Sequence, residues 1–361
     1  MDASGASAPA YLTIDGRRIG PGEPPYVIAE VSGNHNKDIA KALAMIDAAR
    51  EAGADAVKFQ TYTADSLTLP SDKPDFQITT GTWAGWNLHA LYTEAATPYE
   101  WFPQLFERAR QVGITIFSSP FDAEAVDRLE CWGAPAYKIA SNEFTDWPLV
   151  QKCAATGKPL ILSTGTATQE EIEATVAFLA KIGAPDYALL HCVSAYPAPL
   201  SAANLTTIPA LADRFGVVTG FSDHTLGVTA PITAAALGAS IIEKHFILDR
   251  SDGGPDSSFA IEPDELALLC QSVREAHDCL GRPEFGMKAA ETKSPIYKRC
   301  FHTTRPVKAG EVLGPDNIRA IRARQGLPAR RFEAIFGATA KTDIAEHEPL
   351  TEDLVDFGGR S

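Results

Sequence analysis

The chain has 361 residues, enough for one barrel-sized domain with a small appendage or for two medium domains. Its 45% hydrophobic and 22% charged residues are typical of a soluble globular protein. A formal net charge of −14 repels phosphate groups and argues against a nucleic acid partner. The six cysteines form no CxxC pair, no signal-peptide pattern opens the chain, and no apolar run approaches the ~20 residues of a membrane span. We therefore expect a cytoplasmic protein with reduced thiols and no membrane association.

From residue 26 onward, short apolar runs alternate with amphipathic helical patterns. Strands are predicted at 26–31, 56–60, 114–118, 136–140, 159–163, 187–192, 217–221 and 240–246, and helices at 39–52, 100–112, 123–132, 169–182, 229–237 and 265–280 among others. Near-continuous apolar strands between helices indicate a parallel sheet covered on both faces. Eight such units over roughly 250 residues predict a TIM (β/α)8 barrel. The alternative, a doubly wound sheet, typically has a GxGxxG first turn, whereas this one reads Val31-Ser32-Gly33-Asn34-His35-Asn36.

Two segments depart from this pattern. The connection at 61–98 is unusually long and carries Trp83, Trp86 and Tyr92, so we expect it to form part of a substrate mouth at the C-terminal rim of the barrel. The predicted barrel domain spans 1–281, a linker follows at 282–295, and a small β-rich domain occupies 296–361. Within that last domain, the run at 307–313 is echoed at 344–350, a weak internal repeat.

Polar side chains follow every predicted strand, where barrel enzymes place their chemistry. They include Glu30, Lys58, Gln60, Ser118, Ser119, Lys138, Ser141, Glu143, Ser163, Ser194, Tyr196, Ser222, His224 and His245. Unpaired buried charge is costly, so a purely structural barrel would not need Lys and Glu at these positions.

Lys58 and Lys138, with hydroxyls beside them, suit a phosphorylated and carboxylated substrate. A Schiff-base lysine of an aldolase and a simple ion pair with Glu30 or Glu143 are the alternatives. The same two glutamates are available for general acid–base chemistry.

His224 and His245 come at the ends of neighbouring predicted strands. Neutral imidazoles suit a divalent metal, and two of them without a cysteine cluster indicate an open catalytic site rather than a structural zinc. Hydrogen-bonded core histidines are the alternative, and it applies more strongly to His35 and His191.

Seven ordered motifs between residues 28 and 246 resemble the sialic acid synthase family, and the tail resembles the antifreeze-like (SAF) domain of its members. The motifs are Ile28-Ala29-Glu30-Val31-Ser32-Gly33-Asn34-His35-Asn36, Lys58-Phe59-Gln60, Tyr137-Lys138-Ile139-Ala140-Ser141-Asn142-Glu143, Leu162-Ser163-Thr164-Gly165, Leu190-His191-Cys192, Gly220-Phe221-Ser222-Asp223-His224-Thr225 and Glu243-Lys244-His245-Phe246. The resemblance covers nearly the whole chain, from about residue 26 to residue 355.

The resemblance implies an enzyme that condenses phosphoenolpyruvate with an open-chain amino sugar and releases phosphate by C–O cleavage. It implies that His224 and His245 hold Mn²⁺ or Mg²⁺, and that Glu30 and Glu143 handle water and protons. Phosphoenolpyruvate would be held by Lys58, Lys138, Ser141 and Ser163, with Ser222 nearby and a hydroxyl from Ser118 or Ser119. Tyr196 and Ser194 occupy positions that touch substrates in relatives, although the family typically has Asn in place of Ser194.

Family members are also domain-swapped homodimers, in which the tail of one subunit contributes an Arg to the sugar site of the other. Arg322 aligns best with that residue, and Arg324 is the alternative, because the Arg-Pro-Gly segment of the family reads Arg322-Ala323-Arg324 here.

The segments 91–98 and 252–259 are most similar to the pseudaminic acid synthase branch, whose sugar is 2,4-diacetamido-2,4,6-trideoxy-L-altrose. The aromatic residues of the long connection are expected to pack on that sugar. Synthases of N-acetylneuraminate or legionaminic acid, a Schiff-base aldolase and a non-catalytic binding module are the alternatives. The joint presence of Glu30, Lys138, His224 and His245 argues against the binding module.

Overall fold

The computed structural model describes residues 10–293 and 297–359 of the chain. The chain divides into two compact units, Met1–Gly281 and Arg282–Ser361. Residue 296, where the tail domain is predicted to start, lies outside the described residues. No helix in the described part of the chain combines the length and apolarity needed to cross a membrane.

The first unit is a closed barrel of eight parallel strands, which confirms the predicted TIM fold. Its strands, in chain order, are β3 (Tyr26–Glu30), β4 (Ala56–Thr61), β5 (Thr115–Pro120), β6 (Tyr137–Ile139), β7 (Leu160–Ser163), β8 (Tyr187–Cys192), β9 (Val218–Asp223) and β10 (Ile241–His245). The barrel closes where β10 pairs with β3. Because all strands are parallel, their carboxyl ends meet at one rim.

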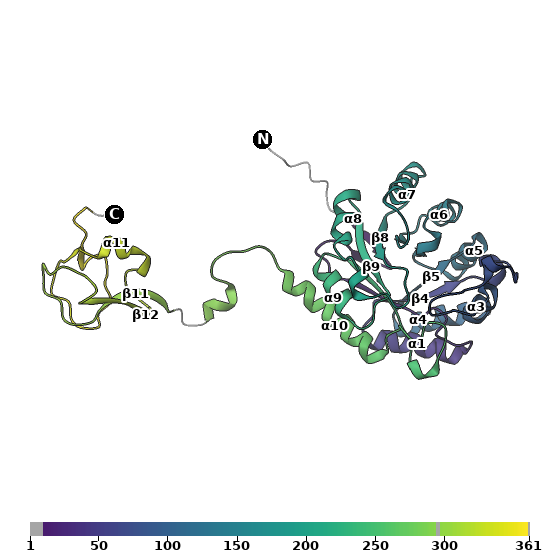
Figure 1. Ribbon diagram of the computed structural model, residues 1–361, viewed down its shortest axis with the longest axis horizontal. Coiled ribbons are helices and arrows are strands. Elements are labelled where there is room, and N and C mark those ends of the chain that lie inside the picture. Colours follow the sequence, from purple (N-terminus) through teal and green to yellow (C-terminus); the bar gives the residue numbers. More distant parts are fainter. Residues whose placement is uncertain (1–9, 294–296, 360–361) are drawn as a thin grey trace. The chain divides into compact units, whose positions relative to one another are not determined.

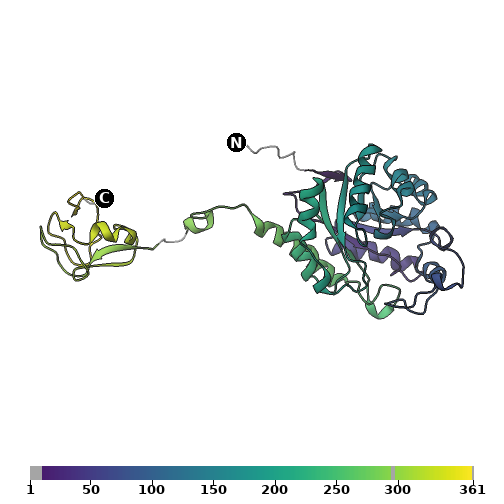
Figure 2. The ribbon, with the colours of Figure 1, turned by 45° about the horizontal axis from the view of Figure 1, so that its top comes forward.

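Helices surround the strands of this unit, as Figure 1 and Figure 2 show. They are α1 (Ile39–Glu51), α4 (Phe102–Val112), α5 (Ala123–Trp132), α6 (Trp147–Ala154), α7 (Gln169–Lys181), α8 (Thr207–Phe215), α9 (Thr229–Ala236) and α10 (Pro263–Leu280). A large apolar core fills the space between the strands and these helices.

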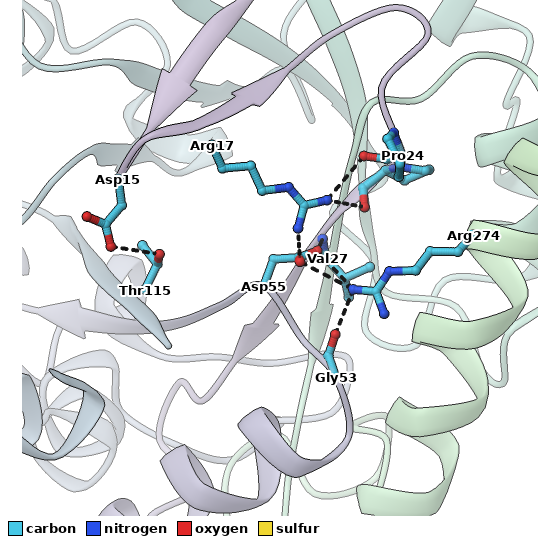
Figure 3. A network of polar contacts seen from close by, with 9 residues as sticks. Asp15, Arg17, Pro24, Val27, Gly53, Asp55, Thr115 and Arg274 are labelled. Atoms are coloured by element: carbon cyan, nitrogen blue, oxygen red, sulfur yellow. Dashed lines mark hydrogen bonds and ion pairs between the residues drawn. The ribbon is translucent and has the colours of Figure 1, made fainter. Parts of the chain in front are cut away.

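A short hairpin closes the N-terminal end of the barrel. Its strands β1 (Leu12–Ile14) and β2 (Arg17–Ile19) bury apolar side chains against Tyr26, Ala56 and Ile241, which open barrel strands. Asp55 anchors the hairpin through Arg17, and it also contacts Arg274 at 3.2 Å, the network drawn in Figure 3. The opposite rim is thereby left as the open end.

The long connection between β4 and α4 folds into helices α2 (Ala64–Leu67) and α3 (Leu88–Ala95) with irregular chain between them. It is attached to the rim at two points. The Trp83 indole donates to the carbonyl of Pro255 at 2.7 Å, and the Thr82 hydroxyl donates to the carbonyl of Tyr196. The connection therefore forms one side of the mouth of the barrel.

The second unit is small and rich in β-structure. Strand β11 (Lys298–Thr303) pairs with β12 (Ile318–Ala323), and β13 (Thr339–Ala340) pairs with β14 (Val355–Asp356), with α11 (Phe332–Ile335) between the pairs. Val307 and Ile344, the first residues of the two sequence repeats, exchange backbone hydrogen bonds of 2.9 and 2.8 Å. The two repeats thus meet at matching positions over one apolar core.

Candidate active site

A cavity of about 390 Å³ lies at the carboxyl ends of the barrel strands. It brings together predicted site residues from all eight strands or the turns after them. Those that line it are Glu30, Lys58, Gln60, Ser119, Lys138, Ser141, Glu143, Ser163, Tyr196, Ser222, His224 and His245.

Two predicted site residues of the first unit do not line this cavity. Ser118 has its hydroxyl 2.8 Å from the carbonyl of Phe59 and 2.7 Å from the Thr61 hydroxyl, so it joins β4 to β5. Ser194 is adjacent to the cavity, because a Cβ on Gly165 would lie 2.6 Å from both its Oγ and that of Ser141. Arg322 lies exposed on β12 in the second unit.

The floor of the cavity is a buried network of two lysines and two glutamates. Lys58 Nζ lies 2.9 Å from Glu30 and 3.5 Å from Glu243, and Lys138 Nζ lies 3.4 Å from Glu243. Lys58 also donates to Ser119 Oγ at 3.1 Å. The ion pair between Lys58 and Glu30 is one of the alternatives left open by the sequence.

Glu243 was not predicted as a site residue, although it precedes His245 by two positions in β10 and so lies on the same face. Burial raises the pKa of Glu243, but Lys138 and Lys58 outweigh burial and hold the carboxylate ionised. The pKa of Lys138 is lowered, first by burial and then by Lys58, with Glu243 offsetting part of the effect. A bound anion beside Lys138 would stabilise the charged ammonium group and offset the burial that lowers its pKa.

The imidazoles of His224 and His245 lie edge-on to one another beside this network. The rings of His224 and His245 have centroids 5.3 Å apart, and burial followed by the proximity of His245 lowers the pKa of His224 to about 3. Nδ1 of His224 lies 2.9 Å from the carbonyl of Val193, and this hydrogen bond leaves Nε2 as the lone-pair nitrogen.

Asp256 adds a carboxylate to this pair, with Oδ2 3.3 Å from His245 Nδ1. It comes from the irregular segment between β10 and α10, within the stretch 252–259 that the sequence comparison singled out, although Asp256 itself was not predicted as a site residue. In the described part of the chain no three His, Cys, Asp or Glu side chains form a ready metal cluster. The two imidazoles therefore fit an open metal site that draws its remaining ligands from water or substrate.

The other two histidines of the motifs are structural. His35 Nε2 lies 3.0 Å from the Thr97 hydroxyl, and His191 Nε2 lies 2.6 Å from the carbonyl of Ala203. Neither lines the cavity. They correspond to the hydrogen-bonded core histidines considered above.

Glu143 sits in the turn after β6 with Oε2 buried and without a hydrogen-bond partner among the described residues. Burial raises its pKa to about 7, even though Lys138 acts in the opposite direction. Glu30, in contrast, is held beside Lys58. The two carboxyl groups predicted for acid–base work thus have different environments, as a proton donor and an ionised partner require.

The side of the cavity formed by the long connection is largely apolar. Leu67, Ile78, Leu88, Leu91, Tyr92 and Trp83 line it, and Phe121 from the turn after β5 also lines the cavity. Tyr62 supports this wall through edge-on contacts with Tyr92 and Phe121, at centroid distances of 5.9 and 5.2 Å. Trp86, expected beside Tyr92, instead lines a neighbouring surface groove and is 43% exposed.

Comparison with known proteins identifies this arrangement. Residues 45–285 match the model of the NeuB family, and residues 298–356 match the SAF domain. The chain belongs to the NeuB family. The resemblance to sialic acid synthases and the barrel-plus-SAF organisation are thereby confirmed.

Two relatives of this NeuB-family chain are pseudaminic acid synthases. The one from Campylobacter jejuni is 41% identical and the alignment covers 91% of this chain and 95% of the relative. The one from Helicobacter pylori is 40% identical, over 92% and 98% of the two chains. A crystal structure of N-acetylneuraminic acid synthetase from Leptospira borgpetersenii, in complex with citrate, is 34% identical with a TM-score of 0.71, covering 79% of this chain and 95% of that one.

Proposed function

We propose that this chain is a pseudaminic acid synthase, which condenses phosphoenolpyruvate with 2,4-diacetamido-2,4,6-trideoxy-L-altrose and water to give pseudaminic acid and phosphate. One observation carries the proposal. A single cavity joins a two-lysine floor, a pair of histidines and an apolar wall, in a chain about 40% identical to two pseudaminic acid synthases.

The lysine floor is the proposed site of phosphoenolpyruvate. Lys58 and Lys138 supply fixed cations, and Ser119, Ser141 and Ser163 supply hydroxyl donors at the same rim. The Ser163 hydroxyl is buried without a hydrogen-bond partner among the described residues, so it is free to donate to a substrate oxygen.

The two histidines are the proposed ligands of Mn²⁺ or Mg²⁺. The Nε2 lone pair of His224 is available because burial lowers the pKa of His224 to about 3 and its Nδ1 is bound to the carbonyl of Val193. A divalent ion bound there supplies Lewis-acid polarisation of the sugar aldehyde. Asp256, 3.3 Å from His245 Nδ1, orients that imidazole.

In the proposed reaction C3 of phosphoenolpyruvate attacks the aldehyde carbon, and the carbonyl oxygen takes up a proton. Water then adds at C2 and loses a proton, and the C–O bond to phosphate breaks. Lys58 and Lys138 hold the anionic groups through both steps. Glu143 is the proposed proton donor, because burial favours its neutral form, and Glu30 beside Lys58 is the proposed acceptor of the proton from water.

Phosphate release tests this function directly. The enzyme is incubated with phosphoenolpyruvate, Mn²⁺ and one of three sugars: the diacetamido altrose, the legionaminic acid precursor or N-acetylmannosamine. We expect release with the altrose sugar alone and its loss on adding EDTA. Release with another sugar would keep the family and change the substrate. No release with any sugar would refute the proposal, and borohydride trapping with pyruvate would then test Lys58 and Lys138 as aldolase lysines.

The pKa of Glu143 predicts the pH dependence of the reaction. Because the neutral acid is the active form and its pKa is raised to about 7, kcat/KM should be level below pH 6 and fall above pH 7. In Glu143→Gln the rate should drop about 10²–10⁴-fold and this descending limb should vanish. A Gln variant that retains the limb would show that another group titrates.

Because the apolar wall is proposed to contact only the sugar, a substitution in it should change the KM for the sugar more than the KM for phosphoenolpyruvate. Tyr92→Ala should raise the KM for the sugar about tenfold, since a lost apolar contact of this size is worth about 1–3 kcal/mol, and should leave the KM for phosphoenolpyruvate nearly unchanged. Trp86→Ala is the matched control, because Trp86 is aromatic and in the same connection but outside the cavity. Equal effects on both substrates would exclude the wall as a sugar site.

We also propose the domain-swapped homodimer, with Arg322 of one chain completing the sugar site of another. The exposure of Arg322 on β12 supports this. Mixing Arg322→Ala with His245→Ala should then recover up to about a quarter of wild-type activity, because a mixed dimer has one intact site. No recovery from subunits shown to exchange would contradict the swap.

A further inference from the structure

Behind the two histidines, on the opposite face of the sheet, lies a buried ion pair that the proposed reaction does not use. Ser222 of β9 and Glu243 of β10 line the cavity, so the next residue of each strand, Asp223 and Lys244, points out of the barrel. Both side chains are about 1% exposed. They lie on the side where Phe221 and Ile242 join the core between strands and helices.

The pair contacts the backbone next to His224. Lys244 Nζ lies 2.5 Å from Asp223 Oδ2 and 2.6 Å from the carbonyl of Thr225, and Asp223 Oδ1 accepts from the backbone N–H of Thr225 at 2.8 Å. Asp223 and Thr225 are the residues immediately before and after His224. These contacts therefore hold the backbone on both sides of His224. The cation that makes them belongs to Lys244, the residue immediately before His245.

The sheet itself does not set the separation of the two histidines. The ladder between β9 and β10 ends at the pair Asp223 and Lys244, one position short of His224 and His245. Beyond it, His245 pairs with Glu30 of β3, and the carbonyl of His224 accepts from Ala198 N–H at 2.9 Å. The ion pair is thus the last link between the two strands before the imidazoles.

We propose that Asp223 and Lys244 are positioning residues for the two-histidine site, which fix the distance between the imidazoles and so its affinity for a divalent ion. This inference rests on the metal site of the proposed function. A buried ion pair is a poor source of net stability, because desolvation offsets the attraction, but it can specify one geometry. Groups that orient metal ligands from behind typically change metal affinity 10–100-fold when they are removed.

The test is Mn²⁺ binding by calorimetry to the full-length double variant Asp223→Asn, Lys244→Met. Asn retains the oxygen that accepts from Thr225, and Met retains the volume of the lysine stem, so no unpaired charge is left buried. We expect the dissociation constant for Mn²⁺ to rise at least about tenfold while phosphoenolpyruvate binding stays within about twofold.

Asp55→Asn is the matched control, since it weakens a charged network at the far end of the same barrel. It should lower Tm without changing Mn²⁺ affinity, whereas the double variant should change Mn²⁺ affinity at a comparable Tm. Should the double variant fail to fold, Lys244→Arg serves, because it keeps a cation beside Asp223 but cannot reproduce the contact geometry of the ammonium group.

Mn²⁺ affinity within twofold of wild type in a folded variant would overturn the positioning role and leave the metal site intact. A wild-type enzyme that binds no Mn²⁺ would overturn the metal site and the positioning role together, so the two failures are distinguishable.

Discussion

His245→Ala is expected to reduce phosphate release by about three orders of magnitude or more, because a metal at this site would contribute several kcal/mol of transition-state stabilisation. His245 faces His224 across 5.3 Å inside the cavity, and no other imidazole in the described cavity lining can replace it. Turnover with phosphoenolpyruvate, the sugar and Mn²⁺ measures the effect, and calorimetry should show the loss of Mn²⁺ binding alongside.

His89→Ala is the control for this prediction. His89 lies in the long connection, paired with Asp65 at 2.8 Å and outside the cavity lining, so its loss should leave turnover and Mn²⁺ affinity nearly unchanged. The variants should share the wild-type circular dichroism spectrum. Full activity in His245→Ala would remove the metal assignment, whereas a loss accompanied by unfolding would have to be repeated with His245→Gln.

Lys58→Met is expected to lower the free energy of unfolding by about 3–5 kcal/mol, the usual result of removing one partner from a buried charge network. The substitution leaves the carboxylates of Glu30 and Glu243 without the cation that lies 2.9 and 3.5 Å from them. Urea denaturation at pH 7 measures the loss, and phosphate release should vanish with it. The penalty should shrink as the pH falls, because protonation removes the uncompensated charge.

Two further variants show whether the stability lost in Lys58→Met comes from the uncompensated carboxylate charge. Adding Glu30→Gln to Lys58→Met removes one of the stranded carboxylates and should restore part of the stability but none of the activity. Lys152→Met breaks an exposed pair with Asp127 and should change stability little or not at all. A loss in Lys58→Met that does not respond to pH or to Glu30→Gln would point to packing rather than electrostatics.

The barrel could be predicted from the sequence because its signals are local. Each strand is an apolar run of a few residues, and the polar residue that ends it lies at the rim whatever its neighbours are. Glu30, Gln60 and His245 illustrate this, since each ends or nearly ends a strand and each lines the cavity.

Only the tertiary structure decided which neighbours in the sequence face the cavity. Ser118 and Ser119 are equivalent by composition, but the register of β5 against β4 pairs Ser119 with Gln60 and turns Ser118 outward. In the same way Tyr92 lines the cavity while Trp86 lies in the groove beside it. Helix α3 turns Tyr92 toward the cavity, whereas Trp86 precedes this helix.

The sequence by itself determined the barrel, its rim residues and the histidine pair, because strand alternation is a property of a few consecutive residues. Only the tertiary structure places Glu243, Asp256 and the pair Asp223 and Lys244 beside the histidines and lysines of the site. Asp256 reaches His245 from an irregular segment, and Lys244 closes on Thr225 across a strand boundary. Contacts of this kind depend on how distant segments pack, so the periodicity of neighbouring residues in the sequence does not predict them.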